Sequence, residues 1–193
     1  NESIMTIRTF YEDNAGNMWI GSRNGLYIFN IETEDIKYYY TDTQGEYSLN
    51  HKSVQCIFED ASKDIWIGTR GGVNYFNQNK SSFQFYSYFP NDCRYLNSAV
   101  VFSIFEDQNE NLWVGTEAGG INYLDRETGL YTYYQHNPDD PYSISTNNIK
   151  CIIEDQHGDL WIGTFAGGLN RYDLENKRFI HFKNDPNDPR SLS

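Results

Sequence analysis

The stretch CIIEDQHGDLWIGT at residues 151–164 has three close relatives elsewhere in the chain. They read TFYEDNAGNMWIGS at 9–22, CIFEDASKDIWIGT at 56–69 and SIFEDQNENLWVGT at 103–116. Their tryptophans, Trp19, Trp66, Trp113 and Trp161, are 47, 47 and 48 residues apart. A repeat of this length, rich in β-branched and aromatic residues, is typical of a β-propeller blade. We therefore predict an all-β fold, a β-propeller with four blades of four antiparallel strands.

The repeat accounts for nearly all of the 193 residues, with blades at 4–50, 51–97, 98–145 and 146–193. Four blades could close on themselves, could form an arc of a larger seven- or eight-bladed propeller, or could pair with a second arc. An open arc would expose the aromatic surfaces between blades. We therefore expect this chain either to close or to self-associate as a dimer.

The second block shows how one blade is built. Its β-rich runs at 53–58, 65–69, 73–76 and 83–88 are separated by turn-forming stretches at 59–64, 70–72 and 77–82. Four short strands joined by tight turns predict an antiparallel meander. Aromatic residues recur on the fourth strand of each block, and we expect them to pack between blades rather than to bind carbohydrate.

Residues that recur at the same distance from the tryptophan in each block are interpreted as structural residues of the fold. An aspartate opens the first turn of each block and accepts hydrogen bonds from turn N–H groups (Asp13, Asp60, Asp107 and Asp155). A glycine two residues after each tryptophan allows neighbouring sheets to approach closely (Gly21, Gly68, Gly115 and Gly163). The tryptophan itself is expected to be a wedge between blades. Glycine pairs at the second turn supply positive φ, with Asn24-Gly25 as the substitute in the first block.

Charge and cysteine content exclude several classes of partner. The 15 Lys and Arg residues against 27 Asp and Glu residues give a net charge of −12. No basic stripe is present to neutralise phosphates, so we expect no nucleic acid and no contact with membrane by this segment. Cys56 and Cys151 share a repeat position and are expected to be small buried fillers, and Cys93 a free thiol.

Three motifs of the last block together carry a resemblance to a known family. They are EDQHGDLWIGT at 154–164, GGLNRYD at 167–173 and NDPNDPRSLS at 184–193. The chain resembles the two-component regulator propeller repeats of Bacteroidetes hybrid two-component sensor histidine kinases. The first block departs from the pattern, with Asn24 in place of glycine and Tyr27 in place of asparagine.

The resemblance implies a periplasmic sensor domain, the ectodomain of an inner-membrane receptor that recognises an oligosaccharide and signals to glycan-utilisation genes. The full-length receptor would be a histidine kinase, whereas this segment is expected to have no enzymatic activity. Propellers of the family usually have seven blades, so four blades resemble a fragment.

Ligand binding is expected where the repeats differ. Loops between strands two and three share one face with the loops that lead to the next blade. The former carry Arg23, Asn24, Arg70, Glu117 and Phe165, and a loop of the latter kind carries Arg94 and Tyr95. Arginine side chains could bind a carboxylate or sulfate, and Phe165 could stack on a sugar ring.

Two other functions stay open at this point: a structural or dimerisation propeller without ligand, and a propeller glycosidase or lyase. Hydrolysis requires two carboxylates that face one cleft, and Glu59-Asp60 alternate across a strand. The pairs Asp60/Asp64 and Asp155/Asp159 offer too few oxygens for calcium, and the four histidines lack metal spacing. We predict no catalytic residue, no metal and no cofactor.

Overall fold

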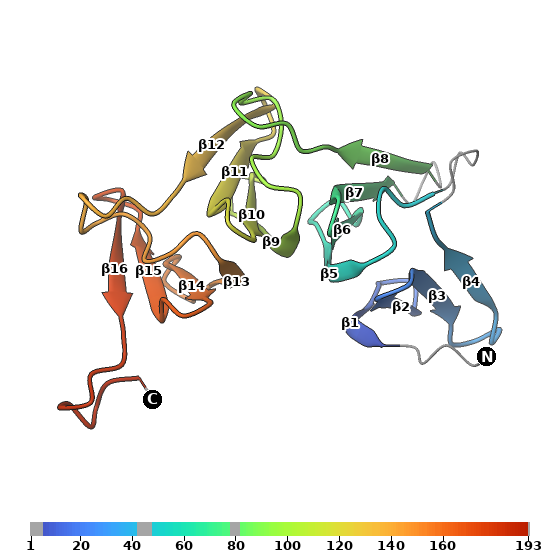
Figure 1. The fold of residues 1–193 in the computed structure, drawn as a ribbon. Coiled ribbons are helices and arrows are strands. Elements are labelled where there is room, and N and C mark those ends of the chain that lie inside the picture. The colour runs from blue at the N-terminus through green and yellow to red at the C-terminus, as the bar shows by residue number, and fades with distance from the viewer. Residues whose placement is uncertain (1–5, 42–47, 78–81, 193) are drawn as a thin grey trace.

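Sixteen strands in four sheets make up the fold, as seen in a computed structural model that describes residues 6–41, 48–77 and 82–192 (Figure 1). No helix is present among these residues. Each sheet has four strands in sequential antiparallel order, which confirms the predicted meander. The part of the chain described contains no helix that could cross a membrane.

The strand bounds follow the four repeats. Blade 1 comprises β1 (Ile7–Glu12), β2 (Asn17–Ser22), β3 (Leu26–Asn30) and β4 (Ile36–Tyr39). Blade 2 comprises β5 (Val54–Glu59), β6 (Ile65–Thr69), β7 (Gly72–Asn77) and β8 (Ser82–Tyr86). Blade 3 comprises β9 (Val101–Glu106), β10 (Leu112–Thr116), β11 (Ile121–Asp125) and β12 (Leu130–Tyr134). Blade 4 comprises β13 (Ile149–Glu154), β14 (Leu160–Thr164), β15 (Leu169–Asp173) and β16 (Arg178–Phe182).

The blades follow one another along an arc, with blade 1 and blade 4 at its two ends (Figure 1). The first strands, β1, β5, β9 and β13, lie on the inner side of the arc, each in contact with the next. The fourth strands lie on the outer side. This placement confirms that the first strand of each blade faces the centre.

Tryptophans hold successive blades together, as expected of a wedge. Trp19, Trp66 and Trp113 are 2%, 2% and 3% exposed. The Trp19 ring meets Phe76 of blade 2 edge-on, with centroids 5.4 Å apart, and each of the three belongs to a core cluster shared with the following blade. Trp161, in blade 4, is only partly buried, because its side of the sheet forms the open end of the arc in this structure.

Each tryptophan is also hydrogen-bonded to the turn aspartate of its own blade. The indole Nε1 donates to the aspartate Oδ2 at 2.7, 2.8, 3.0 and 2.8 Å in blades 1 to 4. The other carboxylate oxygen accepts turn N–H groups, for example Asp64 N to Asp60 Oδ1 at 3.0 Å. The predicted turn role is confirmed, and the bond to the indole additionally locks the ring between the sheets.

The glycines after tryptophan mark the closest approach of adjacent blades. A Cβ at Gly21, Gly68 or Gly115 would lie 2.6–2.7 Å from a Val54, Val101 or Ile149 side-chain atom of the next blade. At Gly163 a Cβ would meet only Cys151 Sγ of its own blade, at 2.5 Å. The steric explanation therefore holds at the three internal interfaces.

The prediction for the second turn is right in three blades and wrong in one. Gly72, Gly120 and Gly168 have φ of 116°, 72° and 78°. Asn24 and Gly25 do not have positive φ. Gly25 serves a different purpose, because a Cβ there would lie 2.5 Å from the Tyr38 ring.

The outer-strand aromatics pack between blades in the last three blades, where Phe83, Tyr131 and Phe179 are buried. Their counterpart Ile36 is 65% exposed, because blade 1 forms the other open end of the arc in this structure. Cys151 is exposed for the equivalent reason at the other end, so its interpretation as a buried filler is wrong. Burial raises the pKa of the Cys56 thiol to about 12, as expected of an inert filler. Cys93 is an exposed free thiol, as predicted.

Candidate functional site

Every inner strand carries a β-bulge at the same repeat position. The extra residues are Arg8, Gln55, Phe102 and Lys150. A bulged residue is outside the hydrogen-bond ladder and its side chain is re-aimed. Arg8 Nη1 donates to Gln55 Oε1 at 2.5 Å, and Lys150 Nζ lies 3.6 Å from the centroid of the Phe102 ring. These unlike residues therefore meet in pairs along the inner side of the arc.

The loops between strands two and three lie beside the start of the inner strands. Their first residue donates a backbone hydrogen bond to the segment that enters the first strand, as in Arg23 N to Thr6 O at 3.0 Å and Arg70 N to Ser53 O at 3.2 Å. Asn50, in the segment that leads into blade 2, donates through Nδ2 to Gly71 O at 3.0 Å. The two kinds of loop thus share one face, as predicted.

A depression of about 420 Å³ opens on this face between blades 1 and 2. Its lining residues are Arg8, Arg23, Asn24, His51, Lys52, Ser53 and Arg70. Four of the 15 basic residues of an acidic chain gather here, and no Asp or Glu is among the described residues that line it. Three of the predicted site residues, Arg23, Asn24 and Arg70, are therefore brought together.

The described residues neutralise the cations of the depression only weakly. Arg70 Nη2 lies 3.9 Å from Glu117 Oε2, and both side chains are nearly half exposed, an arrangement worth at most about 1 kcal/mol. Arg8 is hydrogen-bonded to a neutral amide. Burial lowers the pKa of His51, and the positive charges of Arg70 and Lys52 lower it further. The depression is thus electropositive and suited to an anion.

The other predicted site residues lie outside the depression. Glu117 contacts its rim through Arg70. Phe165 is 64% exposed, with Lys150 Nζ 5.6 Å from its ring centroid. Arg94 is paired with Asp92 at 2.6 Å within its own loop and lies over the Tyr95 ring. The guanidinium of Arg94 is therefore already occupied.

A second depression, of about 350 Å³, adjoins the first. Asn24, Tyr38, Tyr40, Thr41 and Lys52 line it, so Asn24 and Lys52 belong to both depressions. Tyr38 stacks on Tyr40 with ring centroids 5.4 Å apart, and its hydroxyl donates to Asn24 O at 2.9 Å. An aromatic surface is thereby joined to a cationic one.

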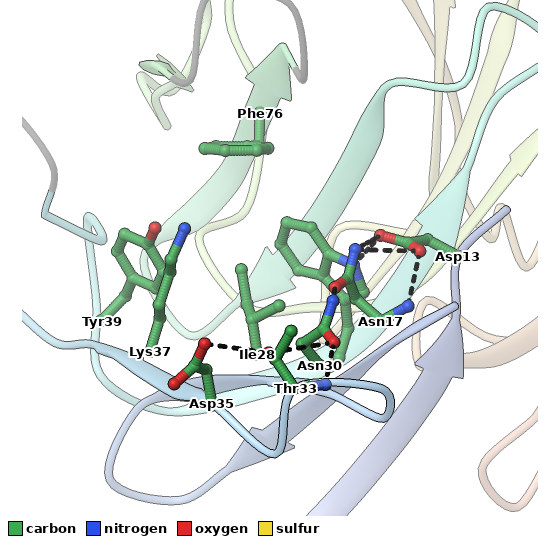
Figure 2. A pocket seen from close by; sticks show the side chains of 10 residues that line it. Asp13, Asn17, Ile28, Asn30, Thr33, Asp35, Lys37, Tyr39 and Phe76 are labelled. Atoms are coloured by element: carbon green, nitrogen blue, oxygen red, sulfur yellow. Dashed lines mark hydrogen bonds between the residues drawn. The ribbon is translucent and has the colours of Figure 1, made fainter. Parts of the chain in front are cut away.

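A third pocket, of about 340 Å³, lies at the other end of the contact between blades 1 and 2, beside the Asp13 turn (Figure 2). Figure 2 shows a chain of polar side chains along it, in which Asn30 Nδ2 donates to Asn17 Oδ1 and Asn17 Nδ2 donates to Asp13. These groups satisfy one another and fix the turns. We therefore interpret this pocket as part of the blade contact.

Arg126 occupies the corresponding position between blades 2 and 3. Its guanidinium is 2.6 Å from Glu106 Oε1 and 3.4 Å from the buried Asp60 Oδ2, and it lies over the Trp66 ring. The contact between blades 2 and 3 is therefore closed by an ion pair.

The neighbouring carboxylates Glu59 and Asp60 are engaged in structural contacts. Glu59 is buried beside Lys63 and is hydrogen-bonded by Asn14, and Asp60 is bound by Trp66. Among the described residues no three His, Cys, Asp or Glu side chains are grouped so that they could hold a metal.

Arg8 and Lys52 line the depression and were not among the predicted site residues, nor was Lys150, which lies beside Phe102 and Phe165. Repeat alignment places Arg8 and Lys150 at one position with Gln55 and Phe102, eleven residues before each tryptophan. The signal in the sequence was that this position holds four unlike residues within a strand that is otherwise similar in all four repeats.

Comparison with known proteins agrees with this architecture. The family model for the two component regulator propeller matches residues 1–24, 48–71, 95–118 and 143–166. Two solved structures of the extracellular domain of BT4673 from B. thetaiotaomicron, described as a one component and as a hybrid two component system, superpose with TM-scores of 0.77 and 0.79 at 25% and 24% identity. They cover 94% and 92% of this chain.

PorZ, a surface component of the type-IX secretion system of Porphyromonas gingivalis, matches with a TM-score of 0.67 at 18% identity over 93% of this chain and 28% of its own, which is a likeness of fold alone. This chain spans 25% of the length of each BT4673 structure. No curated protein matches. The four matched repeats and the fold show that the chain belongs to the two-component regulator propeller family.

Proposed function

We propose that this chain is part of the periplasmic ectodomain of a hybrid two-component sensor histidine kinase and that it recognises an oligosaccharide. Family membership and the likeness to the BT4673 extracellular domain support a sensor role. The observation that carries ligand recognition is the depression between blades 1 and 2, because residues that differ between repeats line it on a shared scaffold.

The mechanism we propose is a change in blade geometry. A ligand in the depression contacts Arg23 of blade 1 and Arg70 of blade 2 at once. Binding favours one relative position of the two blades, and a receptor dimer passes that bias across the membrane to the kinase, which controls glycan-utilisation genes. This segment itself binds and does not catalyse.

The proposal is tested by isothermal titration calorimetry of the purified chain against neutral and acidic oligosaccharides. Binding that is weakened by Arg70→Gln supports it. Arg94→Gln, on a loop of the same face but already paired, is the matched control and leaves binding unchanged. Absence of heat with every saccharide contradicts ligand recognition by this chain.

Self-association is a second role, favoured by the two ends of the arc. Phe10 and Ile36 of blade 1 are 72% and 65% exposed, and Ile153 of blade 4 is 60% exposed on the same face as Trp161. Such apolar surface is characteristic of an interface. We expect a dimer by multi-angle light scattering and a monomer for Ile153→Glu. Ile31→Glu, an exposed position in the turn that follows β3, is the control.

A further inference from the structure

The first blade differs from the others at one position of its third strand, two residues after the last glycine of the second turn. In blades 2, 3 and 4 a fully buried asparagine at this position clamps the incoming loop (Asn74, Asn122 and Asn170). Asn122 Oδ1, for example, accepts from Asn97 N at 2.8 Å, and its Nδ2 donates to Asn97 Oδ1 at 2.9 Å. Blade 1 has Tyr27 instead.

Tyr27 starts a stack of three tyrosine rings. Its centroid is 4.5 Å from that of Tyr38, with 24° between the ring planes, and Tyr38 in turn stacks on Tyr40 at 5.4 Å. Tyr38 and Tyr40 remain 44% and 49% exposed. Gly25 makes room for the Tyr38 ring, since a Cβ there would collide with it. The departure of this block from its repeat therefore builds an exposed aromatic surface.

This surface adjoins the cation-lined depression. Asn24 and Lys52 line both hollows, so a ligand that lies on Tyr40 has the basic groups of the neighbouring depression beside it. The flat face of a tyrosine matches the C–H face of a pyranose ring, which is apolar. Guanidinium groups offer paired N–H donors to a carboxylate or a sulfate ester.

We infer that the ligand of this site is an acidic saccharide, with one sugar ring on the Tyr38–Tyr40 surface and its carboxylate or sulfate bound by Arg23, Arg70 and Lys52. The inference rests on the proposed function and deepens it. Because the chain carries a net charge of −12, a polyanion is repelled outside this hollow. The site therefore selects a short acidic saccharide over an extended polyanion.

The test compares matched trisaccharides of glucose, galactose and mannose, each in neutral, uronic-acid and sulfated form, by calorimetry at 50 and 500 mM NaCl. We expect an acidic form to bind at least about tenfold more tightly than its neutral counterpart, a difference of about 1.4 kcal/mol. High salt shortens the Debye length and reduces this ratio. The uronic-acid and sulfated arms distinguish the two sources of negative charge.

Single-residue variants separate the contribution of the basic groups from that of the tyrosine surface. Arg23→Gln and Arg70→Gln each weaken the acidic form about tenfold, as expected for the loss of a hydrogen bond to a charged group, and leave the neutral form unchanged. Tyr40→Ala weakens both forms equally. The controls are Arg94→Gln and Tyr88→Ala, an exposed tyrosine that follows β8, and they change neither form.

Equal affinity for acidic and neutral forms overturns the inference and leaves saccharide recognition standing. If both Arg23→Gln and Arg70→Gln still bind the acidic form more tightly than the neutral form, the inference is also overturned, because the negative charge would then be bound by other residues. Absence of binding by every saccharide overturns both the inference and the proposed function.

Discussion

Adding one methyl group at Gly68 should weaken the contact between blades 2 and 3. The Cβ of Gly68→Ala would lie 2.7 Å from Val101 Cγ1 of the next blade and would also press on Cys56 Sγ. Ordinary carbon contacts are about 3.5–4.0 Å, so the blades must separate by several tenths of an ångström. Gly68 does not have positive φ, and the cost is therefore steric and not conformational.

The magnitude follows from two opposing terms. Overpacking a tight core contact costs about 1–3 kcal/mol. Replacing glycine by alanine within a strand returns about 0.5–1 kcal/mol by reducing the freedom of the unfolded chain. We expect a net loss of about 1–2 kcal/mol, which for a domain of this size lowers Tm by about 2–8 °C.

Gly163→Ala is the matched control, because the same repeat position in blade 4 has no following blade of this chain. Its Cβ meets only Sγ of Cys151, which is exposed and can move. Urea unfolding followed by both tryptophan fluorescence and circular dichroism measures the two variants, and coincident transitions establish that a single free energy applies. Equal destabilisation by the two substitutions would refute the assignment of the cost to the blade contact.

Three further outcomes follow from the same contacts. Arg126→Ala leaves the carboxylates of Asp60 and Glu106 without their cation and should destabilise the chain by about 2–3 kcal/mol in urea unfolding, whereas Arg126→Lys should lose less. Burial raises the pKa of Asp13, but hydrogen bonds from Trp19, Asn17 and Ala15 outweigh it, so the pKa lies below its ordinary 3.8. The ionised Asp13 carboxylate therefore contributes to the free energy of unfolding above about pH 4, and this contribution is lost as pH falls through the pKa of the folded state. In an acid titration followed by tryptophan fluorescence, Asp13→Asn should lose stability less steeply than the unchanged chain. A thiol reagent should label the exposed Cys93 and Cys151 faster in the native chain than the partly buried Cys56, whose raised pKa keeps it protonated; equal labelling rates for all three would contradict this.

The fold could be predicted because each blade repeats the same local rules. The run Ile65–Thr69 is a strand with the predicted bounds, and the other strands of its blade differ by one or two residues at their ends. The tryptophan pattern also predicted the wedge, because a large ring beside a glycine suits only a close sheet contact. The indole bond to aspartate was missed because it joins residues six apart across a turn.

Only part of the lining of the candidate site could be predicted from the sequence. Loop residues such as Arg23 and Arg70 differ between repeats and were found by that difference. Arg8 escaped because a bulge, and not the strand alternation, decides where its side chain points, and the only trace of this bulge in the sequence is the unlike residue type at this position of each repeat. The stack of Tyr27 on Tyr38 escaped for a related reason, since the departure from asparagine was visible but its structural use was not.

The shared bulge also bears on how such a chain diversifies. Because Arg8, Gln55, Phe102 and Lys150 stand outside the ladder, exchanging one for another leaves every inter-strand hydrogen bond intact. After duplication, a blade can thus acquire a new side chain on the inner side of the arc while its strand pairing stays the same. In propeller repeats with this bulge, ligand specificity can therefore change by substitution of one residue per blade.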